Sequence, residues 1–118
     1  MAFRFEELEI FQLALDFAAN VYDETKKFPS AERFDLTSQT RRAANSIALN
    51  IAEGSGRGTS RDFSHFLDIA VGSTFEMVTC FFLAKKHGYI STQELQEIKK
   101  GGELLSKKIY SFKNTLGR

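Results

Sequence analysis

The chain has 118 residues, 42% of them hydrophobic and 26% charged, and a formal net charge of +1. These values are typical of one soluble globular domain spanning residues 1–118. Its single cysteine excludes an internal disulfide, and no apolar run reaches the roughly 18 residues that a membrane-spanning helix needs. The first residues also lack the basic and apolar stretches of a secretory signal. We therefore expect a cytoplasmic protein with no membrane partner.

Charge is distributed unevenly along the chain. Residues 1–36 carry four basic and eight acidic side chains, whereas residues 37–61 carry four arginines and one glutamate. Residues 62–90 carry two lysines and three acids, and residues 91–118 carry six basic and three acidic side chains. Faces of opposite sign can serve self-assembly or an anionic partner. Four helices with ordinary solvated faces would give the same counts.

The first predicted helix covers about residues 6–26. Its apolar residues form two neighbouring stripes, so the helix is apolar over much of its circumference. Either a wide core face or a second subunit would cover that surface. Pro29 prevents Phe28 from continuing a helix, which places a connection over residues 27–34.

The second predicted helix covers about residues 36–53 and carries two different stripes at helical spacing. The apolar stripe consists of Leu36, Thr40, Ala43, Ile47 and Ile51. The polar stripe beside it consists of Gln39, Arg42, Ser46, Asn50 and Glu53. Because a buried polar group without a hydrogen bond costs roughly 1–3 kcal/mol, such a line should meet another helix, another subunit or a ligand.

We expect these polar residues to form a structural network that includes Glu76 of the next helix. Glu76 lies among apolar residues and needs a partner, for which Arg41 and Arg42 are the candidates. The predicted members of the network are Gln39, Arg41, Arg42, Asn50, Glu53 and Glu76.

A glycine-rich segment, residues 54–61, separates the second helix from the third. We expect a left-handed helix cap at Gly54. Arg57 and Arg61 flank the start of a helix, where free backbone N–H groups attract anions, so both are candidates to contact a nucleic-acid phosphate. The alternative is that this segment is only a turn between two helices. A nucleotide-binding loop is disfavoured because it follows a strand and usually contains a lysine.

The third predicted helix covers about residues 60–87. It begins at a variant of the capping box, Thr59-x-x-Asp62, and its core stripe repeats every three or four residues. Its phenylalanines fall on or beside that stripe, so we expect no aromatic platform on which single-stranded bases could stack.

The fourth predicted helix covers about residues 92–114 and begins at the capping box Ser91-x-x-Glu94. Three lysines face away from its apolar seam and complete the candidate nucleic-acid contacts: Lys99, Lys100 and Lys107. Four apolar helices with short connections predict an all-α fold, an up-down-up-down antiparallel four-helix bundle.

Catalytic chemistry finds little support in the sequence. His65 follows Asp62 at the spacing of one di-iron bundle motif, but a second motif is missing. Cys80 lies on a core stripe, which favours a buried hydrophobic role over a nucleophilic one. We expect no catalytic residue, no metal and no cofactor, and a protein that is not an enzyme.

Three segments resemble a known family. They are Leu36–Ala44, Ser46-Ile47 with Asn50–Gly54, and Ser73, Glu76 and Gly88-Tyr89-Ile90. This pattern resembles the bacterial four-helix bundle family, also called the 23S rRNA intervening sequence protein family, from Phe5 to about Phe112. Ala48 departs from it, because the family often has proline there.

The resemblance implies a homo-oligomer, a ring-like pentamer, and an association with RNA or a ribonucleoprotein. A related branch, the accessory variability proteins of diversity-generating retroelements, forms a basic pentameric barrel that associates with reverse transcriptase and nucleic acid. The alternative is a protein–protein interaction scaffold with no nucleic-acid role, which the nearly neutral charge of this chain favours.

Overall fold

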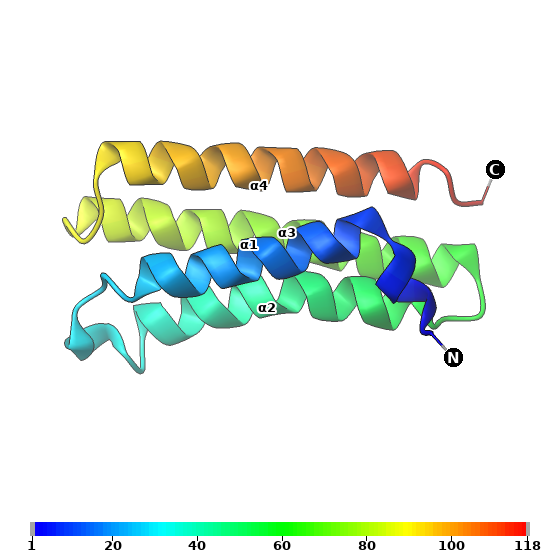
Figure 1. Cartoon of the computed structure of the whole chain (residues 1–118), viewed down its shortest axis with the longest axis horizontal. Helices are drawn as coiled ribbons and strands as arrows, with labels where there is room; N and C mark the ends of the chain where they lie inside the picture. The colour runs from blue at the N-terminus through cyan, green and yellow to red at the C-terminus, as the bar shows by residue number, and fades with distance from the viewer. Residues whose placement is uncertain (1, 118) are drawn as a thin grey trace.

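The computed structural model describes residues 2–117. It contains four α-helices, α1 (Glu9–Thr25), α2 (Leu36–Ser55), α3 (Ser60–Lys86) and α4 (Thr92–Lys113), and two short 3-10 helices, η1 (Arg4–Glu7) and η2 (Ser30–Glu32). Consecutive α-helices run antiparallel, and both chain ends lie at the same end of the bundle (Figure 1). Within residues 2–117 there is no strand, so the predicted all-α antiparallel four-helix bundle is confirmed.

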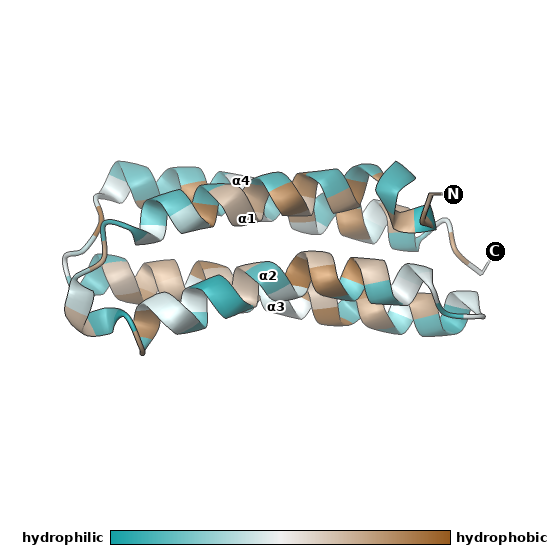
Figure 2. Cartoon of the chain, turned by 60° about the horizontal axis from the view of Figure 1, so that its bottom comes forward, coloured by the Kyte–Doolittle hydropathy of each residue, from teal (hydrophilic) through white to brown (hydrophobic). Residues whose placement is uncertain are grey.

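α2 and α3 make the closest contact, α1 packs on α2 and α4 packs on α3, while α1 and α4 approach each other least among the neighbouring pairs. In Figure 2, α1 and α4 lie on one side of the bundle and α2 and α3 on the other. The bundle measures 45 × 24 × 20 Å. Both predicted N-caps form: Thr59 Oγ1 accepts from the backbone N–H of Asp62 at 3.1 Å, and Ser91 Oγ accepts from that of Glu94 at 3.0 Å, where the full capping box is present. Each satisfies a backbone donor that has no partner inside the helix.

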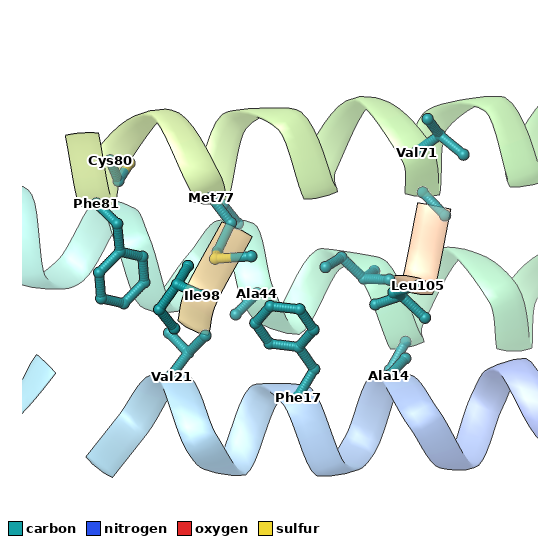
Figure 3. Close-up of a cluster of buried hydrophobic side chains, with 14 of the residues drawn as sticks. Ala14, Phe17, Val21, Ala44, Val71, Met77, Cys80, Phe81, Ile98 and Leu105 are labelled. Atoms are coloured by element: carbon teal, nitrogen blue, oxygen red, sulfur yellow. The ribbon is translucent and has the colours of Figure 1, made fainter. Parts of the chain in front are cut away.

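The core lies where the apolar stripes of all four helices meet. Val21 of α1, Ala44 of α2, Met77 and Phe81 of α3, and Ile98 of α4 converge in its interior (Figure 3). Phe81 is completely buried, and its ring lies 5.8 Å from that of Phe28, edge to face. Phe28 belongs to the connection after α1, so this contact attaches that connection to the bundle.

Gly54 does not form the left-handed cap that its sequence context predicts. It lies inside α2, is buried, and is not one of the glycines with positive φ. A Cβ atom at Gly54 would stand 2.7 Å from Phe66 Cβ and 2.8 Å from Phe63 Cδ1. Gly54 is therefore required for the close approach of α2 to α3 and not for a turn.

α3 is the one described helix that is long and apolar enough to cross a membrane on length and composition alone. In the bundle, 44% of its apolar 18-residue window is buried against other helices. A single such helix is weak evidence of a membrane span, because the core helix of a soluble protein passes the same test.

A hydrogen bond joins the α1–α2 connection to the α3–α4 connection. The hydroxyl of Tyr89 donates to Glu32 Oε2 at 2.6 Å, and the backbone N–H of Leu36 donates to Glu32 Oε1 at 3.3 Å. Both bonds hold the pKa of Glu32 below its ordinary value, and the bond from Tyr89 has the larger effect. The bond between Tyr89 and Glu32 also raises the pKa of the Tyr89 hydroxyl.

A lysine makes a second link at this end of the bundle. Lys27 Nζ donates to Glu24 Oε2 at 2.7 Å and also to the carboxylate of Glu94. The bond from Lys27, followed by the bond from the Ser91 N–H, lowers the pKa of Glu94 to about 2. Glu94 thus caps α4 as a carboxylate and ties it to the end of α1.

Candidate nucleic-acid interface

The three candidate lysines of α4 line one groove, which lies between α3 and α4. The groove has a volume of about 820 Å³ and is also lined by Phe75 and Tyr110. No ion pair joins Lys99, Lys100 or Lys107 to a carboxylate within the described part of the chain. Glu103 lies among them in the lining, so the groove keeps an excess of positive charge.

Three aromatic rings lie exposed on this side of the bundle, which corrects the premise that the core stripe of α3 takes up its phenylalanines. Phe75 is 60% exposed, Phe82 48% and Tyr110 45%. Phe63 and Phe81 do lie in the core, as their stripe predicts. Phe75 and Phe82 are seven residues apart, so they share a second face of α3; that spacing is the signal by which they could have been found.

Lys99 connects the basic and the aromatic parts of the groove. Its Nζ lies 5.7 Å from the centroid of the Phe82 ring, within the range of a cation–π contact. The Lys99 ammonium thus lies over the face of an aromatic ring at the end of the groove.

Arg57 follows the end of α2 and is held by the last turn of that helix. Its Nη2 donates to Glu53 Oε2 at 2.7 Å, and its guanidinium lies 4.6 Å from the centroid of the Phe66 ring. Glu53, predicted as a member of the polar network, is exposed and neutralises this arginine instead. Arg61 is exposed, and no ion pair joins it to a carboxylate within residues 2–117.

The two groups of basic candidates are far apart. Lys99 lies level with Phe82, which follows Arg61 by 21 residues on the same helix. At 1.5 Å per residue this places Arg61 roughly 30 Å from Lys99 along the bundle. The structure therefore joins the three lysines into one surface and leaves the two arginines at the other end.

Two residues of the predicted polar network, Asn50 and Arg41, are hydrogen-bonded inside the bundle, but to residues outside the predicted set. Asn50 Nδ2 donates to the backbone oxygen of Ser46 at 2.8 Å, and Ser46 Oγ lies 2.8 Å from Ser73 Oγ across the α2–α3 contact. Arg41 faces α1, where its Nε donates to Thr25 Oγ1 at 2.8 Å. These bonds satisfy half-buried polar atoms and fix α2 against both neighbours.

Three other predicted members of the network lie at the surface. Gln39, Arg42 and Glu76 are exposed, and they line a pocket of about 360 Å³ at the α2–α3 edge. No ion pair joins Arg42 to Glu76 within residues 2–117. The helical period places these residues on one face, but that face lies at the rim of the α2–α3 contact, where water can solvate them.

The residues considered for catalysis lie apart from one another. Cys80 is buried, and burial raises the pKa of its thiol. His65 packs edge to face on Phe66, while His87 stacks on Tyr89 at the far end of α3. Within residues 2–117, no three His, Cys, Asp or Glu side chains are grouped as a metal site requires.

Comparisons with known proteins agree with this architecture. A family model described as 23S rRNA-intervening sequence protein matches residues 6–111. A crystal structure from Bacteroides thetaiotaomicron, described as a protein with unknown function from the S23 ribosomal protein family, has a TM-score of 0.81 to this chain. The two share 23% sequence identity over 89% of this chain and 95% of that chain, which shows a common fold. None of the curated proteins matches the chain.

Proposed function

Because the chain belongs to the 23S rRNA-intervening sequence protein family, we propose that it is a non-enzymatic helical-bundle protein that associates with ribosomal RNA or other nucleic acid. The observation that supports this role most directly is the groove lined by Lys99, Lys100 and Lys107, whose charges no carboxylate pairs within residues 2–117. Neither the family's description nor that of the structural neighbour names a reaction.

The contact with nucleic acid is proposed to be electrostatic. Ammonium groups that meet phosphates release counterions, and phosphate contacts carry no base information. Arg61 is an additional contact at the other end of the bundle, and Arg57 a weaker one because Glu53 already pairs with it. Several subunits in one assembly would repeat each contact and raise the total affinity.

RNA binding by the purified protein should weaken steeply with salt. If the three groove lysines neutralise three phosphates, the slope of log affinity against log salt is about −2 for a single strand, so affinity falls roughly 20-fold between 50 and 200 mM salt. Fluorescence anisotropy with a labelled RNA measures this directly. A parent protein that shows no salt-dependent binding would contradict the proposed function.

Two pairs of lysines on α4 allow a matched control. Replacing Lys99 and Lys107 with glutamine should weaken binding and flatten the salt slope, because both line the groove. Replacing Lys108 and Lys113 with glutamine removes the same charge from residues already paired with Glu9 and Asp68. Equal losses in the two variants would mean that net charge alone, and not this groove, binds RNA.

We also propose that the protein is a homo-oligomer, and the family resemblance makes a ring-like pentamer the expected form. Large apolar side chains are exposed on α1 and α3 outside the groove, namely Leu15, Tyr22, Ile69 and Leu83. The open polar pocket formed by Gln39, Arg42 and Glu76 lies on the α2–α3 edge. A second subunit would cover apolar surface and supply partners for these polar groups.

Light scattering coupled to size exclusion should therefore give several times the 13.3 kDa chain mass. Glu76→Ala should reduce that mass, because the basic group that pairs with Glu76 across the proposed subunit interface would be left without its acid. Glu97→Ala, which changes an exposed acid on α4, serves as the control. A monomeric parent at micromolar concentration would show that the exposed apolar residues are ordinary surface.

The alternative function is a protein–protein interaction scaffold with no nucleic-acid role. The exposed apolar side chains on α1 and α3 favour it, since such surface is typical of protein interfaces. The anisotropy of labelled RNA distinguishes the two functions, because a scaffold would form the oligomer but leave that anisotropy unchanged.

A further inference from the structure

We propose that the α3–α4 groove binds a single-stranded segment of RNA, with bases stacked on Phe75, Phe82 and Tyr110 and phosphates held by the lysines of α4. This inference rests on the proposed nucleic-acid function and narrows it to one site and one state of the strand. It follows from the position of exposed aromatic rings beside unpaired lysines.

The exposed rings are the first argument. Phe75 is 60% exposed although it lies in the middle of a helix whose other face forms the core. Phe82 and Tyr110 are about half exposed on the same side of the bundle. Isolated apolar residues are ordinary on a protein surface, but here Phe75 and Tyr110 line one groove and Phe82 lies against Lys99 at its end, which together form a surface that a partner can cover.

The charge of the groove is the second argument. Its lining contains three lysines and one acid, Glu103. The nearby lysines Lys108 and Lys113, in contrast, are paired with Glu9 and Asp68. The lysines of the groove therefore carry positive charge that no carboxylate neutralises within residues 2–117, whereas Lys108 and Lys113 are neutralised. This charge favours an anionic occupant over an apolar helix.

The order of the groups along the groove is the third argument. Lys99 lies against Phe82 at one end, and Phe75 follows two helical turns away, roughly 10 Å along α3. Tyr110 lies 11 residues beyond Lys99, roughly 16 Å along α4. Basic and aromatic side chains thus alternate over a length of several nucleotides, the arrangement by which proteins hold single strands without sequence preference.

The strand state follows from the same chemistry. In a duplex each base is already stacked on its neighbours, so only the phosphates could meet the lysines. In a single strand the bases are free to stack on the rings while the backbone follows the lysines. Single-stranded RNA should therefore bind more tightly than a duplex of the same length.

A tryptophan reporter tests the stacking directly, because the chain has no tryptophan of its own. Phe75→Trp places an indole in the groove, and stacked bases should quench its fluorescence when a 12-nucleotide single strand is added. Leu49→Trp is the matched control: Leu49 is 66% exposed but lies on α2, which does not line the groove. We expect quenching for Phe75→Trp with the single strand, little with a duplex, and none for Leu49→Trp.

A second measurement separates stacking from charge. Phe75→Ala and Phe82→Ala should each weaken single-strand binding roughly tenfold while leaving the salt slope unchanged, because they remove a stacking surface and no charge. Glu103→Gln should strengthen binding and steepen the slope, since it removes the one acid of the lining.

The outcomes distinguish the two proposals. If the parent binds RNA with salt dependence but Phe75→Trp is not quenched, or is quenched no more than Leu49→Trp, the stacking of bases in the groove is wrong and the proposed electrostatic binding stands. If the parent binds no RNA, both fail. If acrylamide cannot reach the Phe75→Trp indole before RNA is added, another subunit already covers the groove, and this inference is overturned.

Discussion

Phe81→Ala is expected to lower the free energy of unfolding by about 3–5 kcal/mol. Phe81 is completely buried among the stripes of all four helices, so its removal loses apolar contact and leaves a cavity (Figure 3). It also loses the edge-on contact with Phe28, which attaches the α1–α2 connection. Thermal unfolding should shift downwards by roughly 10–20 °C, as measured by circular dichroism.

The adjacent residue is the control for this prediction. Phe82 is 48% exposed on the groove side of α3, so Phe82→Ala should cost less than about 1.5 kcal/mol. Both variants remove the same atoms from neighbouring positions of one helix. If they destabilise the protein equally, α3 is not rotated about its axis so that Phe81 is buried and Phe82 is exposed.

Gly54→Ala is expected to destabilise the protein by about 1–3 kcal/mol, although alanine is the better helix former. A methyl group at Gly54 would lie 2.7 Å from Phe66 Cβ, and that atom is fixed to the backbone of α3. The added Cβ must therefore push α2 away from α3. Urea unfolding of the variant measures the loss.

Gly72→Ala provides the opposite case. Gly72 lies exposed within α3, and a Cβ atom there would meet nothing within 4 Å. Alanine should gain about 0.5–1 kcal/mol, because glycine loses more backbone entropy in a helix. A Gly54→Ala protein as stable as Gly72→Ala would show that α2 and α3 do not approach this closely.

Much of the architecture could be predicted because it depends on residues close together in the sequence. The N-caps at Thr59 and Ser91 act within one helical turn, and the apolar stripes follow from the helical period alone. The family segments around Asn50 and Tyr89 also stand in the sequence itself. These features predict four helices and their arrangement as an antiparallel bundle.

The details of the candidate site depended on contacts between helices. Periodicity shows that Phe75 and Phe82 share a face of α3, but not that this face opens beside the lysines of α4. It places Arg42 and Glu76 near each other without deciding that both stay exposed at the rim of α2 and α3. The Glu53–Arg57 pair has the i, i+4 spacing of a local ion pair, but periodicity could not reveal that Gly54 would be needed for packing.

The physical reason lies in the rotation of each helix about its own axis. The sequence determines which residues lie on a common stripe, because the helical period is a local property of the backbone. How far each stripe turns towards its neighbours depends on the packing of side chains from all four helices at once. A small rotation moves the flanking residues of a stripe between core and solvent, so the tertiary structure alone decided that Phe81 is buried and Phe82 lies beside Lys99.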